Sequence, residues 1–235
     1  AAQIEPKQRV LDVACGTGVL ARAAADRVGP GGKVSGLDPN AEMLAVARRK
    51  NTWIEWRDGR AEALPWPGET FDAVVSQFGM MFFDSPSDAL REMRRVLRPS
   101  GHLAVAVCDA LDQSPGYAAL AALLQALFGQ PVADAFRAPF VLGDAPRLQA
   151  LCEQAGIADA RVEQHHGVVR FASIEDLVSA ERACAWTLGG LLDDAQFARL
   201  LGGAQQVLAP FAGSDGKVAF DMPALIVTAS KWPQR

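Results

Sequence analysis

The sequence lacks the patterns that would indicate a metal site, a disulfide framework or a membrane-spanning helix. Its four cysteines are Cys15, Cys108, Cys152 and Cys184, and no two of them form a C-x-x-C pair. That spacing predicts no metal centre and no disulfides, which favours a reduced, cytoplasmic environment. No apolar run is long enough to cross a bilayer and no signal peptide is visible, so no membrane partner is expected.

Positive charge is also scarce. The 235 residues carry 23 Lys and Arg against 27 Asp and Glu, which gives a net charge of −4. Nucleic acids and anionic membranes favour basic surfaces, so neither is the expected partner. The one local group of arginines has the i, i+3, i+4, i+7 spacing of a solvated helix face: Arg91, Arg94, Arg95 and Arg98. The sequence gives no indication of the oligomeric state.

Strand and helix patterns alternate along the first half of the chain. Mostly apolar runs predict strands at 9–15, 33–38, 52–57, 71–77 and 102–108, with helices at about 19–28, 41–50 and 88–97. This alternation predicts a parallel sheet with helices on both faces. Further on, we expect helices at 116–129, 144–156, 174–186 and 193–211, a sixth strand at 160–171 and a final strand at 223–230.

A glycine loop follows the first strand, in the segment VLDVACGTGVLA from Val10 to Ala21. Glycine occurs where the backbone turns sharply or comes close to a ligand. The second strand ends at Asp38, 20 residues after Gly18, and a carboxylate there can accept hydrogen bonds from a ribose diol. Together these features predict a ligand that contains adenosine, and they leave both a nicotinamide dinucleotide and S-adenosylmethionine open.

Asp12 discriminates between these two ligands. A dinucleotide loop must accept two phosphate charges, and an acidic side chain inside the preceding strand opposes them. Adenosylmethionine carries an ammonium group and a sulfonium, which a nearby carboxylate favours. A purely structural role for Asp12, as a cap of the loop's own amides, is the alternative.

Five segments occur together in the order and spacing of a known family: VLDVACGTGVLA, GLDPNAEMLAVAR, GRAEALPW, FDAVVSQFGMMFF and ALREMRRVLRPSGHLAV. Over about residues 10–108 the chain resembles the class I S-adenosylmethionine-dependent methyltransferases. It is most similar to the type 11 branch, which includes the ubiquinone and menaquinone C-methyltransferases. The resemblance implies an α/β, Rossmann-like sheet of seven mostly parallel strands, with the last strand antiparallel and helices on both faces.

The resemblance also implies a domain organisation. Residues 1–235 form one methyltransferase domain, in which residues 1–108 are the cofactor-binding core. Residues 109–141 and 172–213 are expected to be helical insertions that form a lid or bind the substrate.

Site residues follow from the same resemblance. It places Asp12, Ala14, Gly16 and Gly18 along the methionine part of the cofactor, and Asp38 at the ribose hydroxyls. Around the adenine and the acceptor, it places Pro39 and Met43 against the ring, the Ala61 amide at the ring edge, and Gln77 and Phe78 between cofactor and acceptor.

Arg60, which is also counted among the predicted cofactor-binding residues, departs from the family pattern. Relatives usually carry GDAEALP where this chain has Gly59-Arg60-Ala61. The aspartate that would accept the adenine amino group is thus replaced by Arg60, which can only donate. We expect its side chain to point away from the adenine or to stack across it.

The expected acceptor is a small apolar or aromatic molecule, methylated at oxygen, nitrogen or carbon by in-line displacement. Its pocket wall is predicted to contain Phe78, Met80, Met81, Phe82 and Phe83, and the lid to contribute Leu120, Leu124 and Trp186. The sequence identifies no catalytic base. Two other functions remain open, a non-catalytic adenosylmethionine-binding module and an NAD-dependent oxidoreductase.

Overall fold

The chain divides into two compact units, each built from separate stretches of sequence. The computed structural model describes residues 1–184 and 186–231. Unit 1 comprises residues 1–107 and 145–163 and a last segment that begins at Ile226. Unit 2 comprises residues 108–144 and 164–225. The insertions expected at 109–141 and 172–213 both lie within unit 2.

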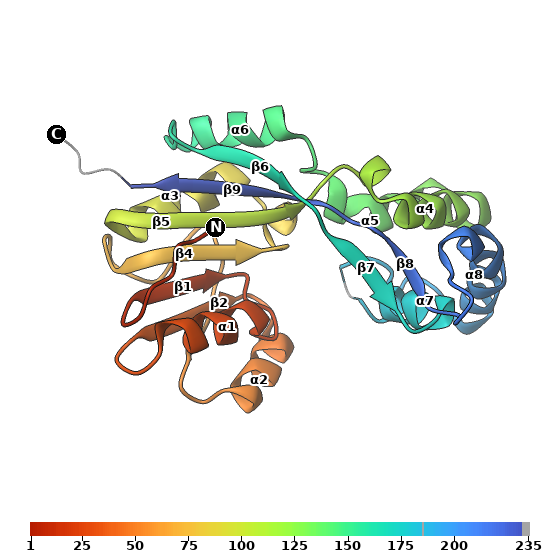
Figure 1. The fold of residues 1–235 in the computed structure, drawn as a ribbon, viewed down its shortest axis with the longest axis horizontal. Coiled ribbons are helices and arrows are strands. Elements are labelled where there is room, and N and C mark those ends of the chain that lie inside the picture. Colours follow the sequence, from red (N-terminus) through yellow and green to blue (C-terminus); the bar gives the residue numbers. More distant parts are fainter. Residues whose placement is uncertain (185, 232–235) are drawn as a thin grey trace. The chain divides into compact units, whose positions relative to one another are not determined.

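Unit 1 is organised around a seven-stranded sheet with the order β3-β2-β1-β4-β5-β9-β6 (Figure 1). Its strands are β1 (Arg9–Val13), β2 (Lys33–Asp38), β3 (Glu55–Asp58), β4 (Phe71–Gln77), β5 (Leu97–Cys108), β6 (Arg161–His165) and β9 (Ala224–Ser230). The pairs β1–β2, β1–β4, β2–β3 and β4–β5 are parallel. The last strand, β9, runs antiparallel to its neighbours, so the fold expected from the sequence is confirmed.

The helices of unit 1 begin at the signals that the sequence carries. The side chain of Asn40 accepts hydrogen bonds from the first-turn amides of α2 (Ala41–Lys50), and Ser85 caps α3 (Pro86–Val96), which has proline at its first position. α1 (Val19–Val28) is different, because it begins directly after Gly18 without a side-chain cap. Its uncapped N-terminus is therefore open toward the glycine loop.

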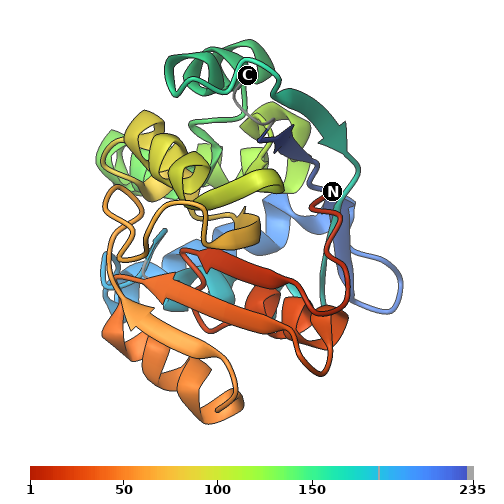
Figure 2. The ribbon, with the colours of Figure 1, turned by 90° about the vertical axis from the view of Figure 1, so that its left-hand side faces the viewer.

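Helices cover both faces of the sheet (Figure 2). On one face, the buried alanines and Val28 of α1 share a hydrophobic cluster with strand residues that include Val10, Val34 and Val75. α3 lies on the other face and contacts α6 (Ala145–Gln154). Both faces are thus buried, and this explains why the strands read as nearly continuous apolar runs.

The junction between α3 and β5 differs from the expectation. The sequence predicts a helix that ends at 97 and a strand that begins at His102, with Pro99, Ser100 and Gly101 in the break between them. Instead β5 begins at Leu97, immediately after the helix, and the register with β4 shifts between Phe71 and Ala73. Ser100 takes a positive φ of 62°, so the cluster forms an irregularity within the strand pairing.

The expectation of one sixth strand over 160–171 is wrong. β6 ends at His165, and β7 (Val168–Phe171) pairs antiparallel with β8 (Val218–Asp221) in a separate two-stranded sheet. Gly167 stands between them, and a Cβ atom there would lie 2.2 Å from the carbonyl oxygen of Met222. This close approach of two backbones requires glycine and redirects the chain.

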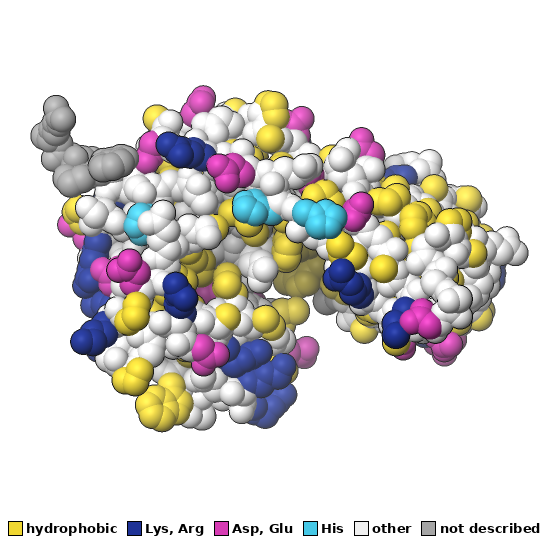
Figure 3. Space-filling view, in the orientation of Figure 1, with side chains coloured by type: hydrophobic (Ala, Val, Ile, Leu, Met, Phe, Trp, Pro, Cys, Tyr) yellow, Lys and Arg dark blue, Asp and Glu magenta, His cyan; other side chains and the backbone are white. Residues whose placement is uncertain are grey.

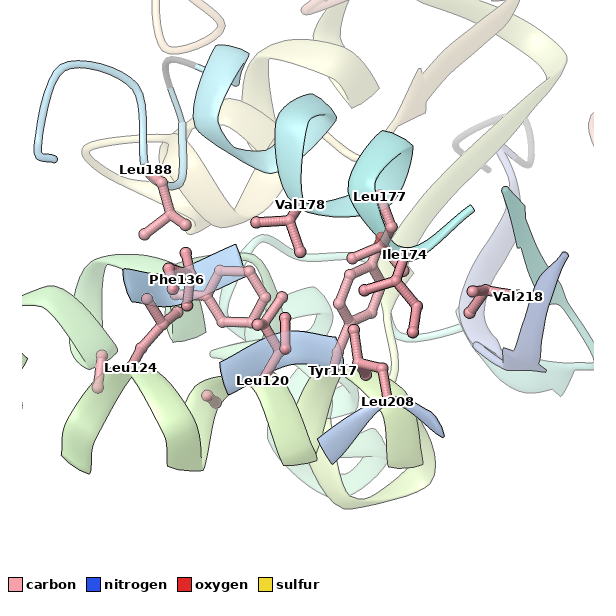
Figure 4. Close-up of a cluster of buried hydrophobic side chains, with 14 of the residues drawn as sticks. Tyr117, Leu120, Leu124, Phe136, Ile174, Leu177, Val178, Leu188, Leu208 and Val218 are labelled. Carbon is pink, nitrogen blue, oxygen red and sulfur yellow. The ribbon is translucent and has the colours of Figure 1, made fainter. Parts of the chain in front are cut away.

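Unit 2 is mostly helical. It contains α4 (Pro115–Phe128), α5 (Gln130–Arg137), α7 (Ile174–Ala183) and α8 (Asp194–Val207), together with β7, β8 and 3₁₀ turns at Leu111–Gln113, Ala138–Phe140 and Ala209–Phe211. Leu120 and Leu124 of α4 meet Leu177 and Val178 of α7 in its core (Figure 4). The sequence analysis did not predict α5, and it extended the helix that begins at 174 as far as Trp186, whereas α7 ends at Ala183; residue 185 of that range lies outside the described residues. Among the described residues, no helix is long and apolar enough to cross a membrane.

Candidate functional site

All eleven residues predicted for the cofactor site lie in unit 1, at or just beyond the carboxyl ends of β1 to β4. In an open α/β sheet this edge is where ligands bind. Asp12 belongs to β1 and Asp38 is the last residue of β2, while Gln77 is the last residue of β4. Met43 lies in the first turn of α2, and the others lie in the loops that follow the strands: Ala14, Gly16 and Gly18 after β1, Pro39 after β2, Arg60 and Ala61 after β3, and Phe78 after β4.

The side chain of Asp38 accepts hydrogen bonds from the loops that follow β1 and β2. Its Oδ2 accepts a hydrogen bond of 2.8 Å from the amide of Gly16, and its Oδ1 accepts one of 2.8 Å from the amide of Asn40. The carboxylate is buried, so these two hydrogen bonds satisfy a charge that burial would otherwise penalise. The sequence did not predict this structural role, which accompanies the expected contact with the ribose.

Neighbouring side chains lie close to both glycines of the glycine loop. Gly16 and Gly18 have φ values of 53° and 77°, a region that favours glycine. A Cβ atom on Gly16 would lie 3.6 Å from the sulfur of Met43, which places Met43 beside the loop. A Cβ atom on Gly18 would lie only 2.3 Å from the Trp56 ring, so Gly18 is required here by a side chain of β3.

Trp56 is a residue that the sequence reasoning missed. Its ring also lies against Gly36, where a Cβ atom would come within 2.5 Å of it, and its Nε1 donates to the carbonyl of Asn51. The indole therefore fills the space between β2 and the glycine loop. Gly36 inside a buried strand was the available signal, since an interior glycine often marks the close approach of another group.

The loops after β1 and β4 also touch. A Cβ atom on Gly79 would lie 2.5 Å from the Cβ of Ala14. Ala14 and Phe78 both have positive φ, at 57° and 54°, and the amide of Phe78 donates to the carbonyl of Ala106. Non-glycine residues in this backbone region are strained, and such strain is concentrated at functional sites.

Asp12 is a buried carboxyl group with an unsatisfied oxygen. It is 1% exposed, and its Oδ2 has no hydrogen-bond partner among the described residues. Burial raises the pKa of Asp12 to about 8; a backbone hydrogen bond at Ala21 opposes this rise, and the charge of Asp38 adds to it. A cationic group of a ligand close to this carboxyl group would give Oδ2 the hydrogen-bond partner that the described residues do not provide.

Arg60 faces other side chains in the loops of unit 1. Its guanidinium forms an ion pair with Asp84, and its Nε lies 3.8 Å from a carboxylate oxygen of Glu62. Glu62 in turn accepts a hydrogen bond from the amide of Ser85. The arginine that replaces the family's aspartate thus links the loop after β3 to the segment before α3.

The expected acceptor pocket needs correction. Met80, Leu120 and Leu124 are 0% exposed, and the two leucines belong to the core of unit 2. They are scaffold residues because they pack against other helices of the fold. Phe78 is 40% exposed and Gln77 is also exposed, so these two remain available beside the glycine loop.

Replacement of Asp38 by alanine should weaken adenosylmethionine binding by about 1.5–3 kcal/mol, because a charge-assisted acceptor is lost. 5′-Methylthioadenosine, which keeps the ribose and lacks the amino acid, should lose affinity to a similar extent. Isothermal calorimetry measures both. The exposed Asp26 of α1 provides the matched control, and Asp26→Ala should leave both affinities unchanged. Unaltered binding by Asp38→Ala would place the ribose elsewhere.

The fold and this loop arrangement define a class of protein, and comparison with known proteins agrees. Two solved structures share the fold. The YcgJ protein of Bacillus subtilis has a TM-score of 0.64 at 18% identity over 99% of this chain and 95% of that one. A SAM-dependent methyltransferase from Aquifex aeolicus has a TM-score of 0.51 at 23% identity, covering 71% and 77% of the two chains.

Sequence comparison gives the family. Residues 11–105 match the type 11 methyltransferase domain. A demethylmenaquinone methyltransferase of Lysinibacillus sphaericus is 34% identical over 180 residues, which cover 70% of this chain and 76% of that protein. The ubiquinone/menaquinone biosynthesis C-methyltransferase of Hahella chejuensis is 46% identical over 102 residues, or 41% of each chain.

The chain belongs to the S-adenosylmethionine-dependent methyltransferases of the type 11 branch. The family resemblance read from the five sequence segments is therefore confirmed. The match to some relatives is partial, since the aligned part spans about two fifths of the Hahella protein and 39% of a Chlorobaculum parvum demethylmenaquinone methyltransferase.

Proposed function

We propose that this protein transfers a methyl group from S-adenosylmethionine to a small apolar or aromatic acceptor. The observation that carries the proposal is the buried Asp12, whose unsatisfied carboxyl oxygen lies in the strand that leads into the glycine loop. In a dinucleotide site, an acidic group at this position would oppose the binding of the two phosphates. In a site for a cationic amino acid, the same group would attract the ammonium group.

The residues at the sheet edge fit adenosylmethionine. Asp12 would hold the ammonium end, Asp38 the ribose and Met43 the adenine, with the glycine loop between them. Bound adenosylmethionine supplies an electrophilic methyl group on a sulfonium. The protein's task is then to orient an acceptor toward that methyl group and to exclude water, since the displacement has a good neutral leaving group.

Unit 2 is proposed to bind the acceptor. Hydrophobic side chains gather over its surface in Figure 3, and its exposed large ones are Val141 (49%), Trp186 (39%) and Leu191 (47%). An apolar surface favours a neutral, apolar acceptor and disfavours a polyanion.

A nucleic-acid acceptor is disfavoured by the distribution of charge. Three of the four arginines at positions 91, 94, 95 and 98 form ion pairs with carboxylates: Arg91 with Asp88 and Arg95 with Glu92 on α3, and Arg98 of β5 with Asp72. These guanidinium groups are partly neutralised by the protein's own side chains. The net charge of −4 adds to this argument.

Calorimetry followed by an acceptor screen tests the proposed function. The protein should bind adenosylmethionine and adenosylhomocysteine and show no detectable binding of NAD at the same concentration. Labelled adenosylmethionine should then transfer its methyl group to members of a panel of apolar phenols, amines and quinols. Methylation confined to phosphorylated metabolites or transfer RNA would refute the apolar acceptor, and binding without any turnover would favour a non-catalytic module.

A further inference from the structure

An open cavity lies at the amino ends of the strands of unit 1, the edge from which β1 and β4 point away in Figure 1. The first residues of β1, β2, β3 and β4 line it, which are Arg9, Lys33, Glu55 and Phe71, and the end of α1 and the loops before β2 and β3 complete it. We call it the amino-edge cavity. Its volume of about 730 Å³ is within the range of small-molecule sites.

The amino-edge cavity is separate from the candidate cofactor site, although the same strands carry both. β2 begins at Lys33 in the cavity and ends at Asp38 beside the glycine loop. Six residues of extended strand, at about 3.3 Å each, keep these two positions on the order of 16 Å apart. A ligand in the cavity therefore does not need to displace one at the carboxyl edge.

Trp53 supplies an aromatic surface to the amino-edge cavity. Its side chain is 91% exposed, although the backbone beneath it is fixed. The Oδ1 of Asn51 accepts hydrogen bonds of 2.8 Å and 3.2 Å from the amides of Trp53 and Ile54, and the side chain of Ile54 is buried. The loop thus holds the indole in solvent beside the cavity. An aromatic ring that stacks on it would bury both rings.

Arg9 brings an incompletely satisfied guanidinium group to the same cavity. Its Nε is buried and has no hydrogen-bond partner among the described residues. The guanidinium carbon lies 5.9 Å from the centre of the Phe71 ring, which also lines the cavity. Asp72 is engaged elsewhere, since it accepts from the backbone amide of Arg9 and pairs with Arg98. The planar fork of a guanidinium group matches a carboxylate.

The other charges of the lining limit the charge of a ligand. Glu55 accepts hydrogen bonds of 2.7 Å from Arg57 and 2.9 Å from the hydroxyl of Ser35. Burial raises the pKa of Glu55, but these bonds and the charges of Arg57 and Arg9 outweigh that effect and hold the pKa below its ordinary value. The lining carries two basic and two acidic side chains, so it favours a single negative charge over a double one.

We propose that the amino-edge cavity binds a planar aromatic carboxylate. The ring of the ligand stacks on Trp53, and its carboxylate accepts hydrogen bonds from the guanidinium group of Arg9. This second small-molecule site goes beyond the proposed function and does not depend on it, because neither residue belongs to the candidate cofactor site.

Isothermal calorimetry with three ligands of one shape tests the chemistry of the site. Naphthalene-2-carboxylate should bind to a single site. Naphthalene-2-carboxamide, which has no charge, should bind at least about tenfold more weakly, and 2-naphthyl phosphate, a dianion, should bind no more tightly than the carboxylate. Saturating adenosylhomocysteine should leave the affinity for the carboxylate unchanged. None of these measurements requires methyl transfer, so they stand whether or not the proposed function does.

Two variants place the ligand in the cavity. Arg9→Met keeps an apolar side chain beside Phe71, so it should weaken the carboxylate about tenfold and leave the carboxamide unaffected. Trp53→Ala should weaken both ligands about fivefold. The matched controls are Arg49→Met on the exposed side of α2 and Leu191→Ala, a 47% exposed position in unit 2, and neither should change binding. If Arg9→Met does not fold, Trp53→Ala carries the test, because so exposed a side chain contributes little to the fold.

Several results would overturn the proposal. These are no binding of naphthalene-2-carboxylate at millimolar concentration, equal affinity for the carboxamide, tighter binding of the phosphate, or competition by adenosylhomocysteine. Unaltered binding by Trp53→Ala would place the ligand elsewhere. Sedimentation with phosphatidylglycerol vesicles that is lost in Trp53→Ala, in a protein that does not bind the carboxylate, would assign the indole to a lipid surface instead.

Discussion

Replacement of Asp12 by asparagine is expected to stabilise the ligand-free protein at alkaline pH. The folded chain keeps the Asp12 proton up to a pKa of about 8, whereas the unfolded chain releases it near the ordinary value of 3.8. Between these values the unfolded state binds fewer protons, so the free energy of unfolding falls as the pH rises. The loss is about 1.4 kcal/mol for each pH unit in this window. Asparagine does not titrate and removes this dependence.

Urea unfolding at pH 5 and pH 8 measures the effect. The variant and the unmodified protein should have similar stabilities near pH 4–5, and the variant should gain a growing advantage toward pH 8. Asp26→Asn, on the exposed side of α1, should follow the unmodified protein at both pH values. Parallel pH curves for Asp12→Asn and the unmodified protein would show that Asp12 is charged in the folded chain.

The same variant should bind adenosylmethionine more weakly, by about 1.5–3 kcal/mol, because a carboxylate partner of the ammonium group is lost. 5′-Methylthioadenosine has no amino acid part, so its affinity should not change. This selectivity separates Asp12→Asn from Asp38→Ala, which should weaken both ligands. Equal losses for both ligands would instead indicate a general disturbance of the glycine loop.

Replacement of Gly36 by alanine is expected to have the second large effect, which is a loss of stability. The added methyl group would lie 2.5 Å from the Trp56 ring and 2.9 Å from the sulfur of Cys15. β2 pairs with β1 on one side and β3 on the other, which leaves its backbone little freedom to move. We expect a loss of about 1–3 kcal/mol in stability from overpacking. Because Trp56 also contacts Gly18, affinity for adenosylmethionine should fall as well.

Trp56→Leu provides the means to test that mechanism. In the double variant the smaller leucine leaves room for the methyl group that Gly36→Ala adds, so the two changes should cost less together than the sum of the single variants. Thermal unfolding and calorimetry of all four proteins measure this coupling. Gly202→Ala in α8 is the control, since nothing lies within 4 Å of its added methyl group. Strict additivity would show that Gly36 is required for another reason.

The core of the fold was predictable because its signals are local. Alternating apolar runs, the Asn40 and Ser85 caps and the glycine loop each depend on neighbours in the sequence. The division of residues 160–171 into β6 and β7 was not, because it depends on Gly167 meeting the backbone of Met222, more than fifty residues later. A continuous polar and apolar alternation gives no sign that a strand changes sheets.

The candidate site, too, could be predicted only in part from the sequence. Family motifs indicated which residues lie at the sheet edge, and the structure places all eleven there. Their roles in the site are still predictions. The motifs did not reveal that Trp56 fills the space beneath Gly18, or that Arg60 pairs with Asp84, because both contacts join separate loops. Leu120 and Leu124 were assigned to a lid because an apolar helix face looks the same in sequence whether it meets a ligand or another helix.

The position of β9 also bears on how the chain folds. This strand lies between β5 and β6 in the sheet, yet nearly all of unit 2 precedes it in the sequence. During synthesis the ribosome therefore releases unit 2 before the strand that completes the sheet of unit 1. Until β9 inserts, β5 and β6 have unpaired edges, which are sites of aggregation. Pairing over such a long stretch of chain is slow, so completion of this sheet is expected to be a late folding event.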